Sequence, residues 1–235
     1  GFAGAERIGD VEHDARGDGL VEFGERRSAV ALTPRATEGD LRVEGLPAEA
    51  ELRDGGVAEA GVVVVLGATG GIGAAFAALL DADPAVASVT RWSRSGGVDL
   101  TDPASIERAA AALTVAPDLV FIATGVLHGA GLAPEKANNQ LSAEALSTAF
   151  AINTIGPALI ARAVLPLMPK GRKTVLAALS ARVGSISDNR LGGWHSYRAS
   201  KAALNMLLKN FALEMARTHP EGVVVGLHPG TVDSA

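Results

Sequence analysis

A β-branched run followed by a glycine-rich turn, GVVVVLGATGGIG at 61–73, constrains the fold more than any other segment. Consecutive valines are typical of a strand that is buried on both faces of a parallel sheet. Small and apolar residues at helical spacing follow in AAFAALLDA at 74–82. A strand, a tight turn and a helix in this order predict the first unit of an α/β fold.

The same alternation continues along the chain. Short apolar segments bounded by turn residues predict further strands at 85–93, 118–125, 173–180 and 222–230. Apolar residues at helical spacing predict helices at 102–113, 142–168 and 196–219, with Asp102 and Ser142 near the starts of the first two. Strands that alternate with helices predict a Rossmann-like, doubly wound parallel sheet.

Charge divides the chain into two unequal parts. Residues 1–57 hold thirteen Asp and Glu residues against seven Arg residues, and they show no sustained apolar period. We expect this part to be an acidic, loosely ordered N-terminal extension, with a small β-rich appendage as the alternative. The main domain is expected over 58–235, because every predicted strand–helix unit lies there.

Composition argues against several classes of protein. The 235 residues include no cysteine, so neither a disulfide nor a thiolate metal site is expected, and we predict no bound metal. The formal net charge of −5 argues against nucleic acid as a partner. No apolar run approaches the ~20 residues of a membrane helix, and the first residues do not resemble a secretory signal. We therefore expect a cytoplasmic protein without a membrane partner.

The glycine turn at 67–73 has the setting in which a dinucleotide binds. Gly67 lets the chain turn sharply out of the strand, Gly71 lets the backbone approach a pyrophosphate, and Gly73 lets the helix pack closely on the sheet. Free N–H groups at the start of the helix then face the phosphates, so Thr69 and Ile72 are also expected at the cofactor. The spacing fits both G-x-x-x-G-x-G and G-x-x-G-x-x-G.

The end of the second predicted strand bears on the choice between NAD and NADP. An acidic residue there would accept hydrogen bonds from the ribose hydroxyls, but the sequence has TRWSRSG at 90–96. Ser93 and Arg94 favour a 2′-phosphate, so NADP is the expected cofactor, with NAD as the alternative. Asp99 and Leu100 are expected near the adenine ring.

Tyr197 and Lys201 lie four residues apart at the start of the last predicted helix, so they share one helix face. A nearby ammonium and a nicotinamide cation would lower the pKa of the phenol. Tyr197, the single tyrosine of the chain, could then exchange a proton with a substrate oxygen while a hydride moves between nicotinamide and carbon. The pair predicts an oxidoreductase that acts on a small-molecule carbonyl or alcohol substrate.

Together these segments resemble the short-chain dehydrogenase/reductase superfamily from about residue 61 to residue 233. The matching pieces are GATGGIG at 67–73, DL at 99–100, NTIGP at 153–157, SARVGSI at 180–186, YRASK at 197–201 and HPGTV at 228–232. Residues 181–206 are similar to a subgroup related to C-factor signalling proteins and sniffer-type carbonyl reductases. The Asn-x-x-Gly-Pro piece favours the short branch of the superfamily, and with it the G-x-x-x-G-x-G spacing.

The resemblance implies roles for further residues. Tyr197 would be the acid and base, Lys201 its electrostatic partner and a ligand of the nicotinamide ribose, and Asn153 would hold a water in a proton relay. Trp194 would form part of the pocket wall. The last helix is apolar on most faces, which together with the family habit predicts a homodimer or homotetramer. Further cofactor contacts are expected at Ala123, Gly125, Pro229, Gly230 and Val232.

Departures from the family pattern favour an alternative function. Ala181 stands where the family has a serine that holds the substrate oxygen, so Ser180, or else Ser185, would have to replace it. The usual asparagines are missing from IATG at 122–125. The sequence stops three residues after Val232, so the last strand of the family's sheet is expected to be absent. The alternative is a non-catalytic NAD(P)-binding sensor or signalling protein on the same fold.

Overall fold

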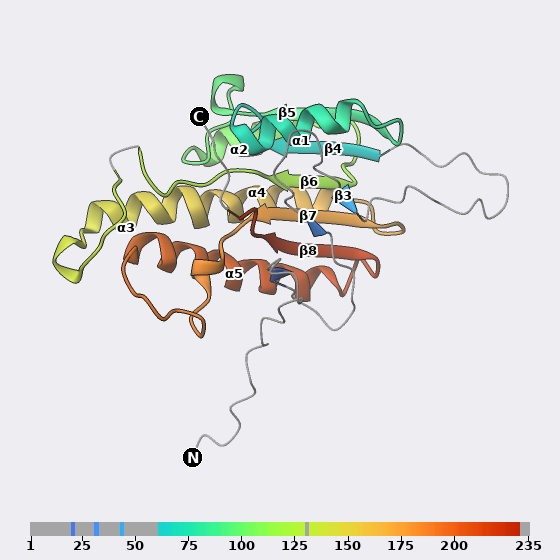
Figure 1. Cartoon of the computed structure of the whole chain (residues 1–235). Helices are drawn as coiled ribbons and strands as arrows, with labels where there is room; N and C mark the ends of the chain where they lie inside the picture. The colour runs from blue at the N-terminus through green and yellow to red at the C-terminus, as the bar shows by residue number, and fades with distance from the viewer. Residues whose placement is uncertain (1–19, 22–30, 33–42, 45–60, 130–131, 231–235) are drawn as a thin grey trace, which may run out of the picture.

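The computed structural model of the chain describes residues 20–21, 31–32, 43–44, 61–129 and 132–230 (Figure 1). The boundary predicted near residue 57 and the cofactor contact predicted at Val232 lie outside these residues. Nearly all of the predicted N-terminal extension lies outside them as well, so its order stays a prediction.

Five parallel strands form the centre of the fold, which confirms the predicted parallel sheet (Figure 1). They lie side by side in the order β5-β4-β6-β7-β8. The central strands β4, β6 and β7 are buried along almost their whole length, as expected for strands covered on both faces. The strands are β4 (Gly61–Leu66), β5 (Val86–Trp92), β6 (Leu119–Ile122), β7 (Thr174–Leu179) and β8 (Gly222–Leu227).

Three two-residue strands come from the N-terminal part of the chain. β1 (Leu20–Val21) pairs antiparallel with β8 and so occupies the edge of the sheet beyond it. β2 (Ala31–Leu32) and β3 (Val43–Glu44) pair antiparallel with each other in a separate sheet. Among the described residues, β8 thus pairs on its outer side with a segment that precedes the α/β units in sequence.

The helices begin where the sequence predicts caps. In α2 (Pro103–Ala111), the N-cap Asp102 accepts a hydrogen bond from Ala104 N at 3.0 Å. In α3 (Ala143–Phe150), the N-cap Ser142 accepts one from Ala145 N at 3.1 Å. The remaining helices are α1 (Gly71–Asp81), α4 (Gly156–Val164) and α5 (His195–Met215).

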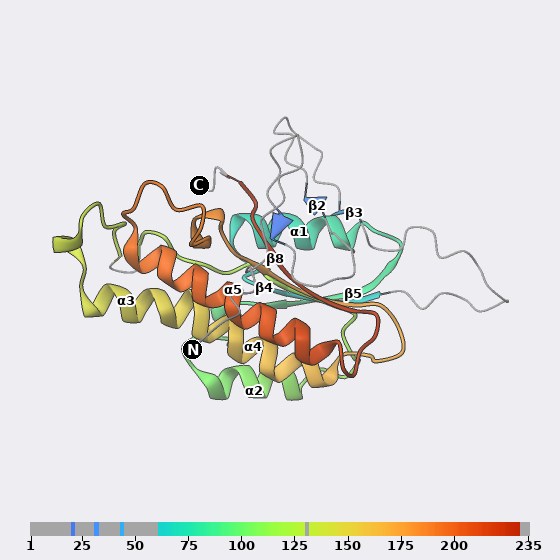
Figure 2. The ribbon, with the colours of Figure 1, turned by 90° about the horizontal axis from the view of Figure 1, so that it is seen from below.

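The helices lie on both faces of the sheet (Figure 2). Helices α2, α4 and α5 cover one face, and α1 is the described helix on the other. Each face carries its own apolar core: one is built around Val64, Ile122, Ile160 and Leu204, and the other around Val65, Phe76 and Phe121. This arrangement leaves the carboxyl ends of the strands open between the two helical layers.

The long helix predicted over 142–168 is interrupted. Between α3 and α4 the chain forms a π-helical segment, η3 (Ala151–Ile155), and a short 3₁₀ segment, η4 (Leu165–Leu167), follows α4. A π segment inside an α-helix often marks a functional position, because its extra residue changes the direction of neighbouring side chains. Asn153, one of the predicted site residues, lies within it.

The stretch Ala143–Leu167 is also long and apolar enough to cross a membrane by length and composition, with a mean hydropathy of 1.5 over 18 residues. The expectation that no segment approaches this length is therefore wrong. However, Ile160, Ala161 and Val164 of this stretch are completely buried in the core beside the sheet. A core helix of this kind passes the same test, so the stretch is weak evidence for a membrane span.

Helix α5 is buried on one face only. Leu204, Leu208 and Met215 are buried against the sheet, whereas Met206 and Leu213 are 57% and 52% exposed. In the single chain α5 is therefore buried on one face, and the predicted subunit contact would have to cover the exposed apolar side chains. One apolar face packs on the core, and the other presents isolated apolar side chains among polar ones.

Candidate active site

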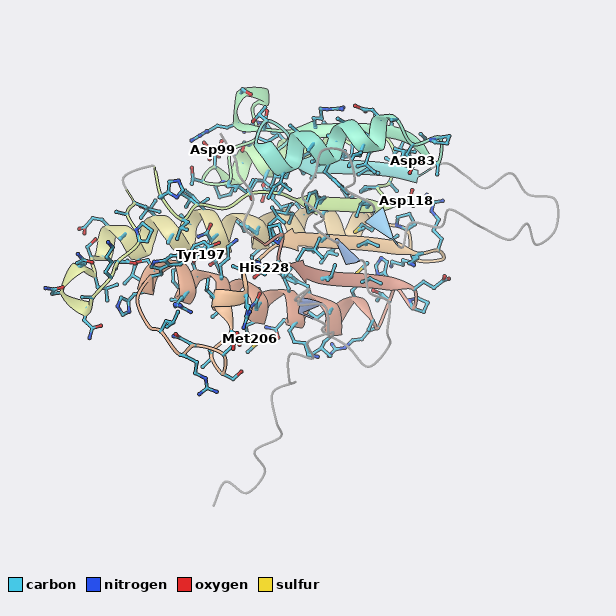
Figure 3. The ribbon with its side chains drawn as sticks, viewed as in Figure 1. Asp83, Asp99, Asp118, Tyr197, Met206 and His228 are labelled. Atoms are coloured by element: carbon cyan, nitrogen blue, oxygen red, sulfur yellow. The ribbon has the colours of Figure 1, made fainter. Side chains whose placement is uncertain are left out.

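The order of the parallel strands predicts a crevice at the carboxyl ends of β4 and β6. From β4 the chain passes through α1 to β5 on one side, and through α2 to β6 on the other side of β4. Open α/β sheets bind ligands at such a switch point. Figure 3 shows Tyr197, His228 and Asp99 toward this end of the strands, whereas Asp83 and Asp118 lie toward the opposite end.

The glycine turn after β4 has the close packing that the sequence predicts. Gly67 has a φ of +78°, and a Cβ added to Gly73 would lie 2.3 Å from the carbonyl oxygen of Gly67. Thr69, Gly70 and Gly71 are exposed, and the N-cap Gly70 gives α1 no side-chain cap. The first N–H groups of this helix are thus free of a cap from that residue, which suits a phosphate.

Residues next to the turn also fit a dinucleotide. The Oγ1 atom of Thr124, just after β6, is buried and has no hydrogen-bond partner among the described residues. A Cβ on Gly67 would lie 2.9 Å from Cγ2 of Thr124, so this side chain borders the turn. Ile72 and Ala123 instead pack against the core. Since buried hydroxyls are normally paired, a ligand in the crevice would explain the orphaned Thr124 hydroxyl.

Ser93 and Arg94 lie at the carboxyl end of β5, at the short helix η1 (Arg94–Gly96). The hydroxyl of Ser93 accepts a hydrogen bond from Gly96 N at 3.1 Å and so caps η1. Arg94 is exposed, and its guanidinium is therefore accessible to an anion. The structure brings both residues to the same end of the sheet as the glycine turn.

Asp99 and Leu100 are only partly available to a ligand. Hydrogen bonds from the backbone and then the hydroxyl of Thr101 lower the pKa of Asp99, against the opposing effect of burial, and the charge of Arg94 lowers it further. Leu100 packs against α4, where a Cβ on Gly156 would lie 2.6 Å from it. Leu100 therefore also has a packing role between the loop and the helix.

Tyr197 and Lys201 lie in the first two turns of α5, as the sequence predicts. Lys201 is 2% exposed, and its Nζ donates a hydrogen bond to the carbonyl oxygen of Leu179 at 2.7 Å. The same Nζ lies 5.8 Å from the centroid of the Tyr197 ring. A Cβ on Gly125 would lie 3.1 Å from it, so the ammonium borders the turn after β6. These contacts bring Tyr197, Lys201 and Gly125 together.

The pKa of Tyr197 in the chain alone differs in direction from the prediction, and that of Lys201 is shifted as well. Burial lowers the pKa of Lys201 to about 8, because the charged form loses solvation. Burial also raises the pKa of Tyr197, whereas the sequence suggests that the ammonium and a bound nicotinamide lower it. In the chain alone, desolvation of the phenol therefore outweighs attraction by Lys201, and the phenol holds its proton at neutral pH.

Asn153 is completely buried and joins three segments. Its Oδ1 accepts a hydrogen bond from Val126 N at 2.7 Å, and its Nδ2 donates to Val126 O at 2.9 Å and to Ser200 Oγ at 3.1 Å. Next to it, Thr154 Oγ1 donates to Ser200 O at 2.8 Å. The π segment thus holds the turn after β6 against the residue that precedes Lys201.

Neither Ser180 nor Ser185 has a described contact with Tyr197 that would let it replace the serine missing at position 181. Ser180 is buried, and its hydroxyl donates to Oδ1 of Asn205 at 2.5 Å. Asn205 lies eight residues, about two helical turns, after Tyr197 on α5. Ser185 accepts a hydrogen bond from the backbone of its own loop at 3.2 Å. The Ser180 hydroxyl thus already donates its proton within the protein, whereas the Ser185 hydroxyl accepts a hydrogen bond there.

Two residues that lie against the first turn of α5 extend the site. The ring of Trp194 lies edge-on to that of Tyr197, with centroids 6.4 Å apart, which agrees with a place in the pocket wall. Glu135, from the loop before α3, is 4% exposed and contacts the same turn of α5. Sequence reasoning missed Glu135, because nothing in the polar segment PEKANNQ at 134–140 indicates that its acidic residue is buried.

The segment after β8 reaches the same end of the sheet. His228, Pro229 and Gly230 are described, and Gly230 has a φ of +74°. Burial and then the charge of Arg182 lower the pKa of His228, so this imidazole is neutral at neutral pH. The predicted contacts at Pro229 and Gly230 thus lie on the side of the crevice that faces β7 and β8.

Comparison with known proteins bears on the family of the chain. Residues 61–235 match the model of a family described as short chain dehydrogenase. A 1-hydroxy-2-glutathionyl-2-methyl-3-butene dehydrogenase of Rhodococcus sp. (strain AD45) is 39% identical over 155 residues, which cover 64% of this chain and 62% of the relative. C-signal of Myxococcus xanthus is 39% identical over 90 residues, which cover 38% and 52%. The matches thus span less than two thirds of these relatives.

Solved structures agree in fold. The NADPH-bound carbonyl reductase from chicken fatty liver is 28% identical, with a TM-score of 0.58 over 75% of this chain and 81% of that one. The carbonyl reductase Sniffer of D. melanogaster has a TM-score of 0.59 over 75% of this chain and 82% of that one. At 20% identity, the second likeness concerns the fold alone.

Proposed function

The chain belongs to the short-chain dehydrogenase family, and we propose on that premise that it is an NAD(P)-dependent oxidoreductase acting on a carbonyl or alcohol substrate. One observation supports this most directly: Lys201, Gly125 and the Tyr197 ring meet at the turn after β6. When bound, the nicotinamide would supply or accept the hydride. The residues of the chain would bind and orient the cofactor and the substrate, and would transfer the proton.

In the proposed reduction, Tyr197 donates the proton. Its raised pKa keeps the phenol neutral before reaction, so the hydroxyl can hydrogen-bond to the substrate oxygen and then release its proton to it. The phenolate that remains is stabilised by the Lys201 ammonium, 5.8 Å from the ring centroid. Because the pKa of Lys201 is about 8, the ammonium form prevails at neutral pH.

Lys201 has a second role in the proposal. An ammonium has three N–H donors, and the carbonyl of Leu179 accepts one of them at 2.7 Å. The others would serve the ribose hydroxyls. The Asn153 amide is hydrogen-bonded to Val126 and Ser200. We therefore propose that Asn153 holds the surrounding segments in place, and that the proton relay from Lys201 passes beside its amide.

Ser180 remains the proposed second donor to the substrate oxygen, although it would have to release Asn205. Loss of such a donor costs about 10²–10³ in rate. We therefore expect turnover to be slower than a site with a free serine would give.

Replacing Tyr197 tests the proposal. We expect Tyr197→Phe to lower kcat for a panel of aldehydes and ketones by about 10²–10⁴, because the proton donor is lost. The affinity for NADPH, measured by titration of its fluorescence, is expected to change less than about threefold, because the hydroxyl is one contact among many. An unchanged rate would overturn the assigned role. Nucleotide binding without turnover of any substrate would favour the sensor instead.

We infer that NADP is preferred over NAD. Arg94 is exposed at the end of β5, and the carbonyl reductase from chicken fatty liver, which is similar in structure, is described as NADPH bound. Arg94→Gln is expected to weaken NADPH binding about tenfold, in the range of a charge-assisted hydrogen bond at an exposed site, and to leave NADH binding unchanged. Equal weakening of both would contradict the assignment.

A homodimer or homotetramer remains a proposal. Ile155, Met206 and Leu213 are 52%, 57% and 52% exposed on η3 and α5, and a subunit contact would cover them. Light scattering on the purified chain measures the mass directly. A mass equal to one chain would remove the proposal.

A further inference from the structure

Glu135 is the one buried residue within the segment 132–140. It is 4% exposed, although its neighbours in this polar loop are exposed or partly exposed. Glutamate is rarely buried without partners, because an ionised carboxylate loses its solvation. The position therefore calls for an explanation in terms of its contacts.

The contacts of Glu135 lie at the start of α5. Its carboxylate accepts a hydrogen bond from Ser196 Oγ, and its two oxygens lie 3.4 and 3.3 Å from Ser196 N. Its backbone carbonyl accepts a hydrogen bond from Trp194 N at 2.5 Å. The side chain and the main chain of one residue thus hold two residues that precede Tyr197.

These contacts act as a cap supplied from 61 residues away. The N-cap residue of α5 is Trp194, whose side chain makes no capping hydrogen bond. A carboxylate at this end satisfies a free N–H group and lies favourably in the field of the helix. Burial acts to raise the pKa of Glu135, but the hydrogen bonds and the nearby His195 outweigh it and keep the pKa below its usual value.

The held segment is conformationally strained. Gly192, Gly193 and Trp194 have φ values of +64°, +65° and +51°, and Trp194 is the one non-glycine residue with positive φ in the described chain. A bulky side chain is unfavourable in this region. Arg198 contributes by donating from Nε to Gly193 O at 3.1 Å. In this conformation the indole lies edge-on to the Tyr197 ring, at an interplanar angle of 70°.

We propose that Glu135 is a positioning residue of the active site. It holds Trp194 in its left-handed conformation and fixes the first turn of α5, so that the indole covers one side of the Tyr197 phenol. Trp194 remains 38% exposed and would offer substrates a rigid aromatic wall beside the proton donor. The consequence for rate rests on the proposed function, whereas the consequence for Trp194 does not.

The experiment compares Glu135→Ala and Glu135→Gln, with Glu144→Ala as the matched control. Glu144 is an exposed acid in the first turn of α3 and, unlike Glu135, is not buried against α5. Glutamine keeps the shape of glutamate and one acceptor oxygen, and the Ser196 hydroxyl can reverse its role toward the amide. The alanine variant lacks both, and the glutamine variant is therefore the rescue.

The first readout is the fluorescence of Trp194 in the full chain without cofactor, in a Trp92→Phe background that leaves Trp194 as the single tryptophan. We expect Glu135→Ala to shift the emission to longer wavelength and to increase quenching by acrylamide, because the indole leaves its place. Glu135→Gln and Glu144→Ala are expected to match the unsubstituted background. Identical spectra for Glu135→Ala and the background would overturn the proposal.

The second readout is turnover with NADPH and an aldehyde. Glu135→Ala is expected to lower kcat by about 10- to 100-fold, in the range that small displacements of a reacting group cause, with the KM for NADPH changed less than about threefold. Glu135→Gln should recover most of kcat. A displaced Trp194 with an unchanged kcat would also overturn the positioning role.

Ser196→Ala provides a second variant that does not depend on the folding of Glu135→Ala. It removes the hydroxyl donor from the other side of the contact and should displace Trp194 in the same direction. An unchanged Trp194 spectrum in this variant counts against the proposal. If Tyr197→Phe retains full turnover, the proposed function fails, while the fluorescence test of Glu135 still stands.

Discussion

The two sides of the crevice are built in different ways. On the cofactor side, the polar contacts of the predicted ribose and adenine residues and of the cap of α2 join close neighbours: Ser93 with Gly96, Asp99 with Thr101, and Asp102 with Ala104. On the Tyr197 side they join residues far apart in sequence: Asn153 with Val126 over 27 residues, Asn153 with Ser200 over 47, and Glu135 with Ser196 over 61.

The cofactor side therefore depends on local sequence, and the Tyr197 side depends on contacts between distant segments. The cofactor side follows from a local pattern of strand, glycine turn and capped helix, so a short segment contains most of its information. The Tyr197 side is assembled from the turn after β6, the π segment and α5. Substitutions on the first side should therefore disturb folding and nucleotide binding together, and substitutions on the second should disturb turnover more selectively.

The largest expected effect is on the cofactor side. A Cβ at Gly73 would lie 2.3 Å from the carbonyl oxygen of Gly67 and 2.8 Å from its carbonyl carbon. Because backbone atoms cannot move aside as a flexible side chain can, Gly73→Ala should lower the free energy of unfolding by about 3 kcal/mol. Urea unfolding measures this loss, and NADPH titration should show weaker binding in the same variant.

Gly171→Ala is the control for that substitution. A Cβ at Gly171 meets no atom within 4 Å, and its φ is not positive. We expect the control to change stability by less than about 0.5 kcal/mol. If Gly73→Ala behaves like this control, the close approach of helix and turn is not needed on the cofactor side.

A second glycine tests the Tyr197 side. Gly184, in η5 (Arg182–Gly184), packs on α5, where a Cβ would lie 2.9 Å from the carbonyl carbon of Lys201. Gly184→Ala is expected to lower the free energy of unfolding by about 2 kcal/mol. Since the clash falls on the backbone of Lys201, kcat should drop by about 10- to 100-fold. If NADPH affinity falls as much as kcat in this variant, the Tyr197 side does not affect turnover selectively, and the proposed difference between the two sides is wrong.

The sequence predicts the cofactor side better than the Tyr197 side for a physical reason. Strands, caps and the turn at Gly67 follow from local preferences, so their positions agree with the structure. The pair of Tyr197 and Lys201 also has a readable spacing. The burial of Glu135, the bond between Ser180 and Asn205 and the π segment at 151–155 depend on which segments meet in space. Periodicity and spacing contain no information about such meetings.

The pKa of Tyr197 illustrates the same limit. From the sequence, the nearby ammonium is expected to lower it, because opposite charges within reach favour the ionised phenol. Its direction in the structure is upward, because burial of the ring removes solvent from the phenolate. The spacing of two residues on a helix indicates that they are close, but only packing determines how much water each one keeps.

The smallest of these effects concerns Lys201, where stability and the proposed function oppose each other. Its pKa in the folded chain is about 8, below the ordinary value of 10.5, so the folded state binds this proton less readily than the unfolded state. At 1.36 kcal/mol per unit, the buried ammonium costs about 3 kcal/mol at neutral pH. Methionine leaves the carbonyl of Leu179 without this side-chain donor, which offsets about 1 kcal/mol of the gain. Lys201→Met should therefore stabilise the cofactor-free chain by about 1–2 kcal/mol at pH 7.

The pH dependence distinguishes this explanation from better packing by methionine. Between pH 8 and 10.5 the unfolded chain binds the Lys201 proton while the folded chain has lost it, so the stability of the natural chain rises with pH in this window. The advantage of Lys201→Met should shrink by about 2 kcal/mol between pH 7 and pH 10 in urea unfolding. Both chains carry Tyr197→Phe in this comparison, because the Lys201 charge, 5.8 Å from the ring, acts on the ionisation of Tyr197. Lys170→Met, at an exposed position, is the control and should leave the stability of the chain unchanged at pH 7. A pH-independent gain for Lys201→Met would mean that the ammonium is better solvated than its burial indicates, and the two sides of the crevice would then differ less than their contacts suggest.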